Sequence, residues 1–276
     1  MATKTDIAPR LERHLKDLHL PTIRECFSSE ADRARKESLS HEAYLLELME
    51  REIEDRRQRR IERFLRESKL PLEKNMETFE MERLPAKVRS QVSVLLEGSF
   101  LDRCDNVLAF GNVGSGKTHL LCAIASELVH QERRVLFTTC SILVQDLLIA
   151  KRELKLKNKL KSLDRFDAIQ IDDIGYVQHD REEMEVLFSL LAHRYERRSV
   201  MITSNLPFSG WEVIFKDPMT TAAAIDRLVH HAVILELNIP SYRLEHSGGS
   251  GGKASMGKGG GKKAGKKGGE QQRRQT

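Results

Sequence analysis

The sequence has little of what a secreted or membrane protein requires. Its cysteines show no C-x-x-C spacing and no paired histidine ligands, which favours free, mostly buried thiols in a reducing compartment: Cys26, Cys104, Cys122 and Cys140. No apolar run approaches the roughly 18 residues that a membrane span needs. The amino terminus has no apolar signal core. We therefore expect a cytoplasmic protein with no membrane segment.

Aromatic residues are also scarce, at 5% of the chain, whereas 32% of the residues are charged. This composition favours a helix-rich, well-solvated protein over a β-sandwich. The net charge of +5 is unevenly distributed, because residues 247–276 carry eight Lys and Arg against Glu270 alone, a net of +7, and the rest of the chain carries −2. Attraction to polyanions must therefore come from local patches and from this tail.

The tail, residues 247–276, differs in composition from the rest of the chain. Eleven of the 17 glycines lie between Gly248 and Gly269, interleaved with lysine and with almost no apolar side chains. Such a segment cannot bury enough surface to offset its ordering entropy, so we expect it to be disordered. It is either a native basic tail or an artificial addition.

Residues 9–74 are dense in charge and carry apolar side chains at helical intervals. This pattern predicts three or four helices with apolar faces of period 3.6. Pro21 and Pro71 mark the expected breaks, and Ser40 is a candidate N-cap. We take residues 1–74 as a helical N-terminal domain.

Six arginines occupy three turns of the segment DRRQRRIERFLRE at residues 55–67: Arg56, Arg57, Arg59, Arg60, Arg63 and Arg66. One interpretation is a solvated helix face on which these arginines pair with acids about one turn away, among Glu52, Asp55, Glu62 and Glu67. The other is a nucleic-acid contact surface. The sequence leaves both open.

After a connector at residues 75–103, short apolar and β-branched runs recur about every thirty residues, with helical patterns between them: 107–110, 135–139, 168–172, 200–204 and 232–237. Strands that alternate with amphipathic helices imply right-handed crossovers and a parallel sheet covered on both faces. We therefore predict an α/β nucleotide-binding domain over residues 75–246. The connector is where we expect the adenine pocket.

The first run leads into GNVGSGKTHL at residues 111–120, whose Gly-x-x-x-x-Gly-Lys-Thr spacing is the phosphate-binding P-loop pattern. Its backbone N–H groups cradle phosphates at the positive end of the following helix. Lys117 is predicted to reach the β- and γ-phosphates of ATP, and the Thr118 hydroxyl to bind Mg²⁺. The predicted nucleotide-binding residues are Gly111, Asn112, Val113, Gly114, Ser115, Gly116, Lys117, Thr118 and His119.

Two later strands end in polar residues that complete such a site. AIQIDD at residues 168–173 places an acidic pair at the carboxyl edge of the sheet, where open α/β folds bind ligands. Asp172 is predicted to hold the metal, and Asp173, where many such ATPases have Glu, to polarise the attacking water. Asn205, at the end of VMITSN, is predicted to orient that water and report the nucleotide state, although it is also a plausible loop cap.

A helix ending in AAAIDRLVHH at residues 222–231 supplies a further candidate. Arg227 is predicted to act as an arginine finger in a neighbouring subunit's site; the alternative is an ordinary ion pair with a nearby acid. His230 and His231 are interpreted as helix-end residues rather than metal ligands, because no acidic or Cys partner lies at ligand spacing.

Together, GNVGSGKTHL, AIQIDDIGYV, MITSNLPF and AIDRLVHHAVILEL resemble the IstB-like helper ATPases of bacterial insertion sequences, relatives of the helicase loader DnaC and the initiator DnaA in the AAA+ class. The resemblance covers roughly residues 10–245. Family members commonly carry a proline pair where this chain has Asn112 and Val113, a departure expected to alter loop stiffness rather than chemistry.

The resemblance implies a P-loop AAA+ core with a five-stranded parallel sheet, behind a small all-α N-terminal domain for DNA binding or oligomerisation. It implies an ATP-dependent homo-oligomer that assembles on double-stranded DNA, remodels it and presents it as an insertion target to the transposase of the same element. ATP would lie between protomers, with Arg227 of one reading the γ-phosphate held by Lys117 and Asp172 of another.

A lysine-rich segment, AKRELKLKNKLKS at residues 150–162, is the predicted DNA contact. It is expected on one helix after the second strand, with few acids nearby, and in the initiator clade this region faces the DNA-lining interior of the assembly. The candidate residues are Lys151, Arg152, Lys155, Lys157, Lys159 and Lys161. The alternative is a merely solubilising helix.

Other functions remain open at this stage. A replicative helicase loader like DnaC shares the ATPase motifs and differs in its partner. A small-molecule kinase is disfavoured because a lysine-rich helix replaces any evident acceptor-binding lid. A catalytically inert, ATP-gated structural protein would bind ATP without turnover.

Overall fold

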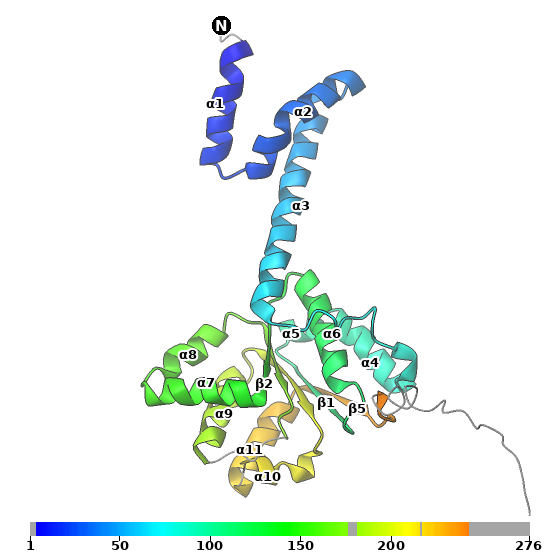
Figure 1. Ribbon diagram of the computed structural model, residues 1–276, viewed down its shortest axis with the longest axis vertical. Coiled ribbons are helices and arrows are strands. Elements are labelled where there is room, and N and C mark those ends of the chain that lie inside the picture. Colours follow the sequence, from blue (N-terminus) through cyan, green and yellow to red (C-terminus); the bar gives the residue numbers. More distant parts are fainter. Residues whose placement is uncertain (1–3, 176–180, 216, 243–276) are drawn as a thin grey trace, which may run out of the picture.

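The computed structural model describes residues 4–175, 181–215 and 217–242. It has two parts, a group of helices at the N-terminus and an α/β core, and the long helix α3 (His41–Ser68) joins them (Figure 1). Residues 247–276, and with them the prediction of a disordered tail, lie outside the described residues. Within the described ranges, no helix is long and apolar enough to cross a membrane.

The described helices of the N-terminal part are α1 (Lys4–Asp17), α2 (Pro21–Glu37) and α3. Their number agrees with the three or four helices that the apolar periodicity predicts. Pro21 begins α2, where its missing N–H costs no helical hydrogen bond. α3 ends at Ser68, shortly before Pro71. The predicted N-cap is confirmed, since Ser40 Oγ accepts a hydrogen bond from Ala43 N at 3.2 Å.

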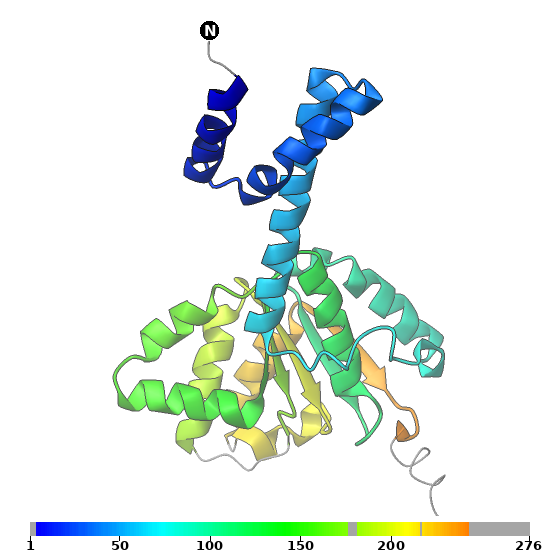
Figure 2. The same cartoon turned by 45° about the horizontal axis from the view of Figure 1, so that its top comes forward.

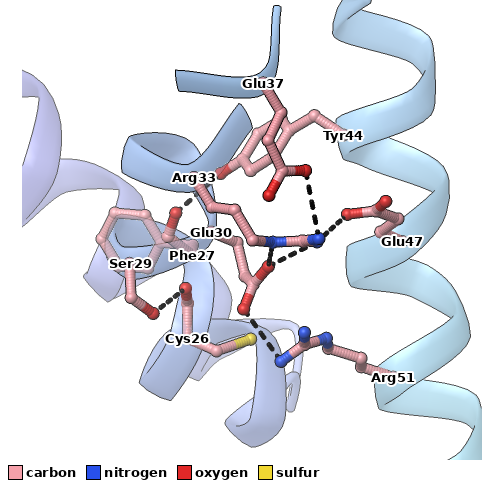
Figure 3. Close-up of polar contacts among 9 residues, drawn as sticks. All are labelled: Cys26, Phe27, Ser29, Glu30, Arg33, Glu37, Tyr44, Glu47 and Arg51. Atoms are coloured by element: carbon pink, nitrogen blue, oxygen red, sulfur yellow. Dashed lines mark hydrogen bonds and ion pairs between the residues drawn. The ribbon is translucent and has the colours of Figure 1, made fainter. Parts of the chain in front are cut away.

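A polar network holds α2 against α3, with only a small apolar core beside it (Figure 3). Glu30 of α2 is 8% exposed, accepts from Arg33 Nε at 2.9 Å and pairs with Arg51 Nη1 of α3 at 2.9 Å. Arg33 also pairs with Glu47 of α3. The apolar cluster of buried residues in this part consists of Leu15, Ile23 and Leu48. Because a buried carboxylate is costly without partners, these ion pairs fix how α2 sits on α3.

The core is built on a parallel sheet that has five strands among the described residues, in the order β2-β3-β4-β1-β5. The strands are β1 (Asn106–Gly111), β2 (Val135–Thr139), β3 (Ala168–Asp172), β4 (Ser199–Ser204) and β5 (Ala232–Leu237). All the predicted strands are confirmed, with β1 and β4 slightly longer than expected. Since β1 lies between β4 and β5, the strand order reverses beside β1, and a ligand crevice belongs at the carboxyl ends of these strands.

Helices cover both faces of the sheet (Figures 1 and 2). One apolar cluster joins the sheet to α4 (Ala86–Leu96), α6 (Lys117–His130) and the lower end of α3, and another joins it to α7 (Cys140–Arg152), α9 (Arg181–Arg194) and α11 (Pro218–Val229). Val107 and Ala109 belong to the first cluster and Leu108 to the second, as strand alternation requires. The remaining short elements are η1 (Met81–Arg83), α5 (Ser99–Asp102), η2 (Phe208–Gly210) and α10 (Glu212–Phe215).

The lower end of α3 is fixed to the core. Phe64 is buried in the cluster formed with α4 and α6. Arg134, just before β2, donates to Glu67 at 2.6 Å and stacks over the Phe64 ring at 5.2 Å. The helix therefore leaves the core as a rigid arm whose far end carries α1 and α2 (Figure 2).

The arginine-rich segment of α3 forms ion pairs. Arg59 pairs with Asp55 one turn away at 2.6 Å, and Arg56 likewise with Glu52 at 2.7 Å. Arg57 and Arg60 reach Glu132 in the turn between α6 and β2. These contacts support the predicted one-turn ion pairs for Arg56 and Arg59, whereas Arg57 and Arg60 pair with an acid outside the helix, which the sequence did not indicate.

The lysine-rich segment consists of two helices, so the prediction of one helix over residues 150–162 is wrong. α7 ends at Arg152, and α8 (Leu156–Leu163) begins after a turn at residues 153–155. Leu154 in this turn has a left-handed φ of 59°, and Lys155 N donates to Ala150 O at 2.7 Å, the long hydrogen bond of a Schellman C-cap. Sequence periodicity gave no sign of the turn because the left-handed residue is not glycine.

The cysteines are free thiols, as the sequence predicts. Cys122 on α6 and Cys140 at the start of α7 are buried, and burial raises the pKa of each thiol to about 12. Thiols with so high a pKa stay protonated, so these two cysteines are inert packing residues at neutral pH.

Candidate nucleotide site

The glycine-rich loop lies between β1 and α6, where the sequence places it. Gly116, the N-cap of α6, has a φ of 90°. A Cβ at Gly111 would lie 2.4 Å from the Leu237 carbonyl oxygen of β5, so only glycine fits there. The loop runs directly into the N-terminus of α6, whose unpaired N–H groups and dipole suit a bound phosphate.

Lys117 is 7% exposed and folds back over the loop. Its Nζ donates to the carbonyl oxygens of Gly111 and Asn112, both at 2.9 Å. A buried ammonium group needs such acceptors. A phosphate entering the loop would offer stronger, charged acceptors to the same donors.

Side chains from three elements meet at Asp172, the last residue of β3. Its Oδ1 accepts from Thr118 Oγ1 at 2.8 Å and from Thr203 Oγ1 at 2.6 Å. The structure thus brings together the threonine and the aspartate that the sequence assigns to the metal. Hydroxyl and carboxylate oxygens are hard ligands of the kind Mg²⁺ prefers, so this donor set fits that ion.

Thr203 of β4 is a residue that sequence reasoning missed. It is fully buried, and besides donating to Asp172 it accepts a hydrogen bond from Asp173 N at 2.8 Å. One hydroxyl therefore fixes both acidic residues. The available signal was a threonine in the otherwise apolar run VMIT, but its meaning depends on β4 lying beside β3, which the sequence does not state.

Asp173 and Asn205 line one cavity of about 360 Å³ with residues 113–119 of the loop. Asn205 Oδ1 and Ser115 Oγ are buried there and have no hydrogen-bond partner among the described residues. Orphaned buried oxygens are costly unless a ligand or water completes their hydrogen bonds. The cavity is therefore arranged for a polar ligand, and it unites the loop with two of the predicted catalytic side chains.

The connector between α3 and α4 forms another wall of the cavity. From the sequence, we expect the adenine pocket in this connector. Thr78 Oγ1 lies 3.0 Å from His119 Nε2, and the Phe79 and His119 rings meet edge to face with centroids 5.2 Å apart. Burial lowers the pKa of His119, which favours the neutral imidazole. Arg83 stacks over the Tyr242 ring at 4.9 Å at the same wall. Aromatic and guanidinium planes of this kind suit a nucleobase.

Arg227 is absent from the described residues that line this cavity. On α11, its Nη1 donates to Ala223 O at 2.8 Å, and its guanidinium lies 5.0 Å from the centre of the Phe188 ring on α9. The predicted finger is thus not brought together with Lys117 and Asp172 within one chain.

His230 caps the end of α11, in agreement with the helix-end interpretation. The spacing argument against a metal was nevertheless incomplete, because the fold brings Glu196, from the turn after α9, to both histidines. The ligand atoms of Glu196, His230 and His231 lie within 4.8 Å of one another, and all three residues are exposed. His230 Nδ1 also lies 3.0 Å from the Tyr195 hydroxyl.

The predicted DNA-contacting residues lie on α7, on α8 and in the turn between them. Acids partly neutralise them. Glu182 and Glu185 come from α9, which the sequence did not reveal, Asp146 lies on α7 and Glu153 lies in the turn: the pairs are Lys151–Glu185, Arg152–Glu182, Lys155–Glu153 and Lys159–Asp146. Lys157 and Lys161 are exposed and form no ion pair with a described residue. Because most of these pairs are solvent-exposed, each contributes little stability and is readily exchanged.

Comparison with known proteins agrees with this site. The family model described as "IstB-like ATP binding protein" matches residues 13–250. An insertion sequence ATP-binding protein of Sinorhizobium fredii is 45% identical over 85% of this chain and 79% of its own length. The insertion sequence IS5376 ATP-binding protein of Geobacillus stearothermophilus is 35% identical over 85% of this chain and 94% of its own length.

Among solved structures, that of the DnaC helicase loader aligns with a TM-score of 0.51 at 16% identity, covering 60% of this chain and 96% of DnaC. At that identity the likeness shows the fold alone, a P-loop AAA+ fold. With the family model spanning most of the sequence, the chain belongs to the IstB-like ATP-binding proteins of insertion sequences.

Proposed function

We propose that this protein is an ATPase that assembles on duplex DNA as a homo-oligomer and helps the transposase of its insertion sequence capture target DNA. The observation that carries the ATPase is the convergence at Asp172, where Thr118 and Thr203 meet beside a cavity lined by Asp173 and Asn205. A pure ATP-binding module has no need of an acid and an amide aimed at the same cavity.

The roles follow from position. Lys117 binds the β- and γ-phosphates and neutralises their charge. Thr118 and Asp172 would hold Mg²⁺, which would supply further charge neutralisation. Asp173, at the cavity wall, accepts a proton from the attacking water, and the unpartnered Asn205 Oδ1 orients that water.

Arg227 is proposed to act between protomers. Arg227 does not line its own cavity; it lies against the Phe188 ring of α9 and forms no ion pair with a described residue, which leaves the guanidinium available to a neighbouring chain's γ-phosphate. An arginine supplied in this way raises turnover by about 10³–10⁵-fold in other P-loop enzymes. Assembly and hydrolysis would then be coupled, because the complete site exists only at a protomer boundary.

Self-association and DNA binding have separate supports. Helices α1 and α3 and the turn after α1 expose large apolar side chains, suited to contacts with a second copy: Ile7, Leu11, Leu18, Leu45, Leu46, Met49 and Ile53. The α7–α8 segment supplies the cations for phosphate contacts. Of these, Lys157 and Lys161 are exposed and form no ion pair with a described residue.

The test measures ATPase rate and particle size with and without duplex DNA for wild type and three variants. Lys117→Ala should lose ATP binding and turnover. Asp173→Asn should bind ATP but lose turnover. Arg227→Ala should bind ATP yet fail to hydrolyse it or to assemble normally. Equal turnover in all four proteins would contradict the assigned site.

The helicase-loader alternative predicts a different DNA preference. A transposition helper should prefer duplex DNA and form ATP-stabilised assemblies on it, whereas a loader should prefer single strands and bind a helicase. Competition between single- and double-stranded DNA of equal length separates the two, and preference for the single strand would overturn target capture.

A further inference from the structure

Two histidines and a glutamate meet where α11 ends, outside the nucleotide cavity. The ligand atoms of Glu196, His230 and His231 lie within 4.8 Å of one another. The two imidazole rings are direct neighbours, with centroids 4.2 Å apart. Glu196 comes from the turn after α9, so the cluster joins two elements that are far apart in the sequence. Among the residues that the structure describes, this is the only group of three His, Cys, Asp or Glu side chains that lie so close together.

The backbone on both sides of the cluster is held in place. Arg194, directly before the turn, is 1% exposed, and its Nη2 donates to Ser199 O at 3.0 Å, so that it bridges the turn that carries Glu196. On the other side, Asn106 N of β1 donates to His231 O at 2.7 Å. The cluster therefore sits on rigid elements, and only rotation of its own side chains is needed to bring the ligand atoms closer.

A further contact orients the first histidine. His230 Nδ1 lies 3.0 Å from the Tyr195 hydroxyl. This hydroxyl can accept the Nδ1 proton, which leaves the lone pair of Nε2 for a metal ion. Histidines that bind metals almost always have such a partner on the other ring nitrogen. All three side chains of the cluster are exposed, so an ion can reach them from solvent.

The donor set identifies the class of ion. Imidazole nitrogen suits Zn²⁺ and its neighbours Cu²⁺ and Ni²⁺, whereas Mg²⁺ and Ca²⁺ prefer oxygen ligands. Two imidazoles and one carboxylate form a zinc-binding set in which water takes the fourth position. Tetrahedral zinc with bonds of about 2.1 Å needs ligand atoms about 3.4 Å apart, a spacing that exposed side chains within 4.8 Å of one another can reach by rotation.

We propose that Glu196, His230 and His231 bind a divalent transition metal of the zinc class, with water as the fourth ligand. The metal fastens the end of α11 to the turn after α9. Arg227 lies one turn before His230 on α11, and its guanidinium is 5.0 Å from the centre of the Phe188 ring on α9. Occupancy of the site therefore restricts the helix that carries this arginine. None of the three ligands is among the described residues that line the nucleotide cavity, so metal binding needs neither ATP nor DNA.

The test titrates zinc alone into the metal-free full chain, with excess Mg²⁺ present, and follows heat release and melting temperature. Wild type should bind one zinc per chain and melt at a higher temperature, because an ion that binds only the folded state stabilises it. Glu196→Gln and His231→Ala should each bind zinc at least about tenfold more weakly, since even the outer partners of metal ligands contribute about 10–100-fold to affinity. His130→Ala removes an exposed histidine at the end of α6 and is the matched control, which should bind zinc as wild type does.

Hydrogen exchange locates the bound ion. Zinc should slow the exchange of amides at the end of α11 in wild type and leave them unchanged in His231→Ala. Because the substituted side chains are exposed, the variants should melt as wild type does without zinc, so a lost response cannot be attributed to misfolding.

The metal site is overturned if wild type binds zinc no more tightly than His231→Ala does. It is also overturned if His130→Ala weakens zinc binding as much as His231→Ala, since scattered surface histidines would then hold the ion. Zinc binding that leaves the exchange of α11 unchanged in wild type would likewise place the ion elsewhere and overturn the assignment.

Discussion

The core and the helical N-terminal part are stabilised in opposite ways. The core buries two large apolar clusters against a sheet. Among the described residues, the helical part has one small apolar cluster, Leu15, Ile23 and Leu48, and depends on the charged network around Glu30 and Arg33 (Figure 3). A densely packed core holds catalytic groups in fixed positions, while an arm with polar internal contacts and exposed apolar side chains is suited to contact partners. This comparison is consistent with the proposal that the core carries out the chemistry and that the helical part mediates assembly.

The largest effect should come from a change confined to the core. Thr203→Val keeps the shape of the side chain but removes the hydroxyl that fixes Asp172 and Asp173. Residues that orient metal ligands typically contribute about 10–100-fold to metal affinity or activity. We expect the ATPase rate at fixed Mg²⁺ to fall by that factor and to recover partly at high Mg²⁺.

The matched control is Thr138→Val in β2, whose hydroxyl donates to the Thr139 carbonyl oxygen away from the acidic pair. Turnover of this variant should equal that of wild type. If Thr203→Val hydrolyses ATP at the wild-type rate with unchanged Mg²⁺ dependence, the hydroxyl is a packing group and the proposed metal site loses its support.

Thr203 also marks the limit of what the sequence predicts. The strands were predictable because buried β-branched runs alternate with amphipathic helices, and the loop because its glycines and lysine have a fixed spacing. Asp172 and Thr118 were predictable because each follows such a marker. Thr203 was not, because its role depends on β4 pairing with β3, a property of strand order.

The same reason explains the other differences. Glu182 and Glu185 neutralise part of the lysine-rich segment only because α7 and α9 pack together, and Asp146 of α7 reaches Lys159 only because α8 folds back beside α7. Glu196 reaches His230 only because the turn after α9 meets the end of α11. Local patterns predict elements and motifs, whereas contacts between elements far apart in the sequence require the folded chain.

The next effect concerns the helical part alone. Glu52 of α3 is 2% exposed and accepts hydrogen bonds from Thr22 N at 2.9 Å and Ile23 N at 3.1 Å, so it caps α2 from outside that helix. Glu52→Ala should destabilise the packing of α2 on α3 by about 1–2 kcal/mol, the usual cost of losing an N-cap. Hydrogen exchange of α2 amides should speed up while basal ATPase activity stays unchanged.

Glu50→Ala, two residues earlier and exposed, is the matched control and should leave the exchange of α2 amides unchanged. A drop in basal turnover of Glu52→Ala equal to its loss of protection would show that the two parts are coupled. That outcome would break the division between chemistry and assembly.

A smaller effect is expected from pH. Burial alone would raise the pKa of Glu52. The hydrogen bonds from Arg56 and from the backbone N–H groups of Ile23 and Thr22 outweigh this effect, so its pKa lies below the ordinary 4.5. Such a carboxylate stabilises the fold above its ordinary pKa, and this contribution is lost as the pH falls through the pKa of the folded state. Protection of α2 amides, corrected for the intrinsic exchange rate, should therefore decline between about pH 6 and pH 3. In Glu52→Gln the decline should be shallower, and an identical decline would assign the acid sensitivity to other groups.

The smallest effect should come from the arginine-rich face of α3. It decides whether that segment is an ion-paired helix face or a nucleic-acid contact surface. Arg59 and Asp55 pair at 2.6 Å, with side chains 51% and 37% exposed. Pairs of this kind contribute about 0.3–0.5 kcal/mol on a helix surface, so Arg59→Gln should barely change the unfolding free energy. Duplex affinity and its salt dependence should also stay as in wild type, whereas Lys157→Gln on α8 should reduce the salt slope by about one unit. If Arg59→Gln shows that reduction and Lys157→Gln does not, DNA contacts the arm rather than the α7–α8 segment of the core.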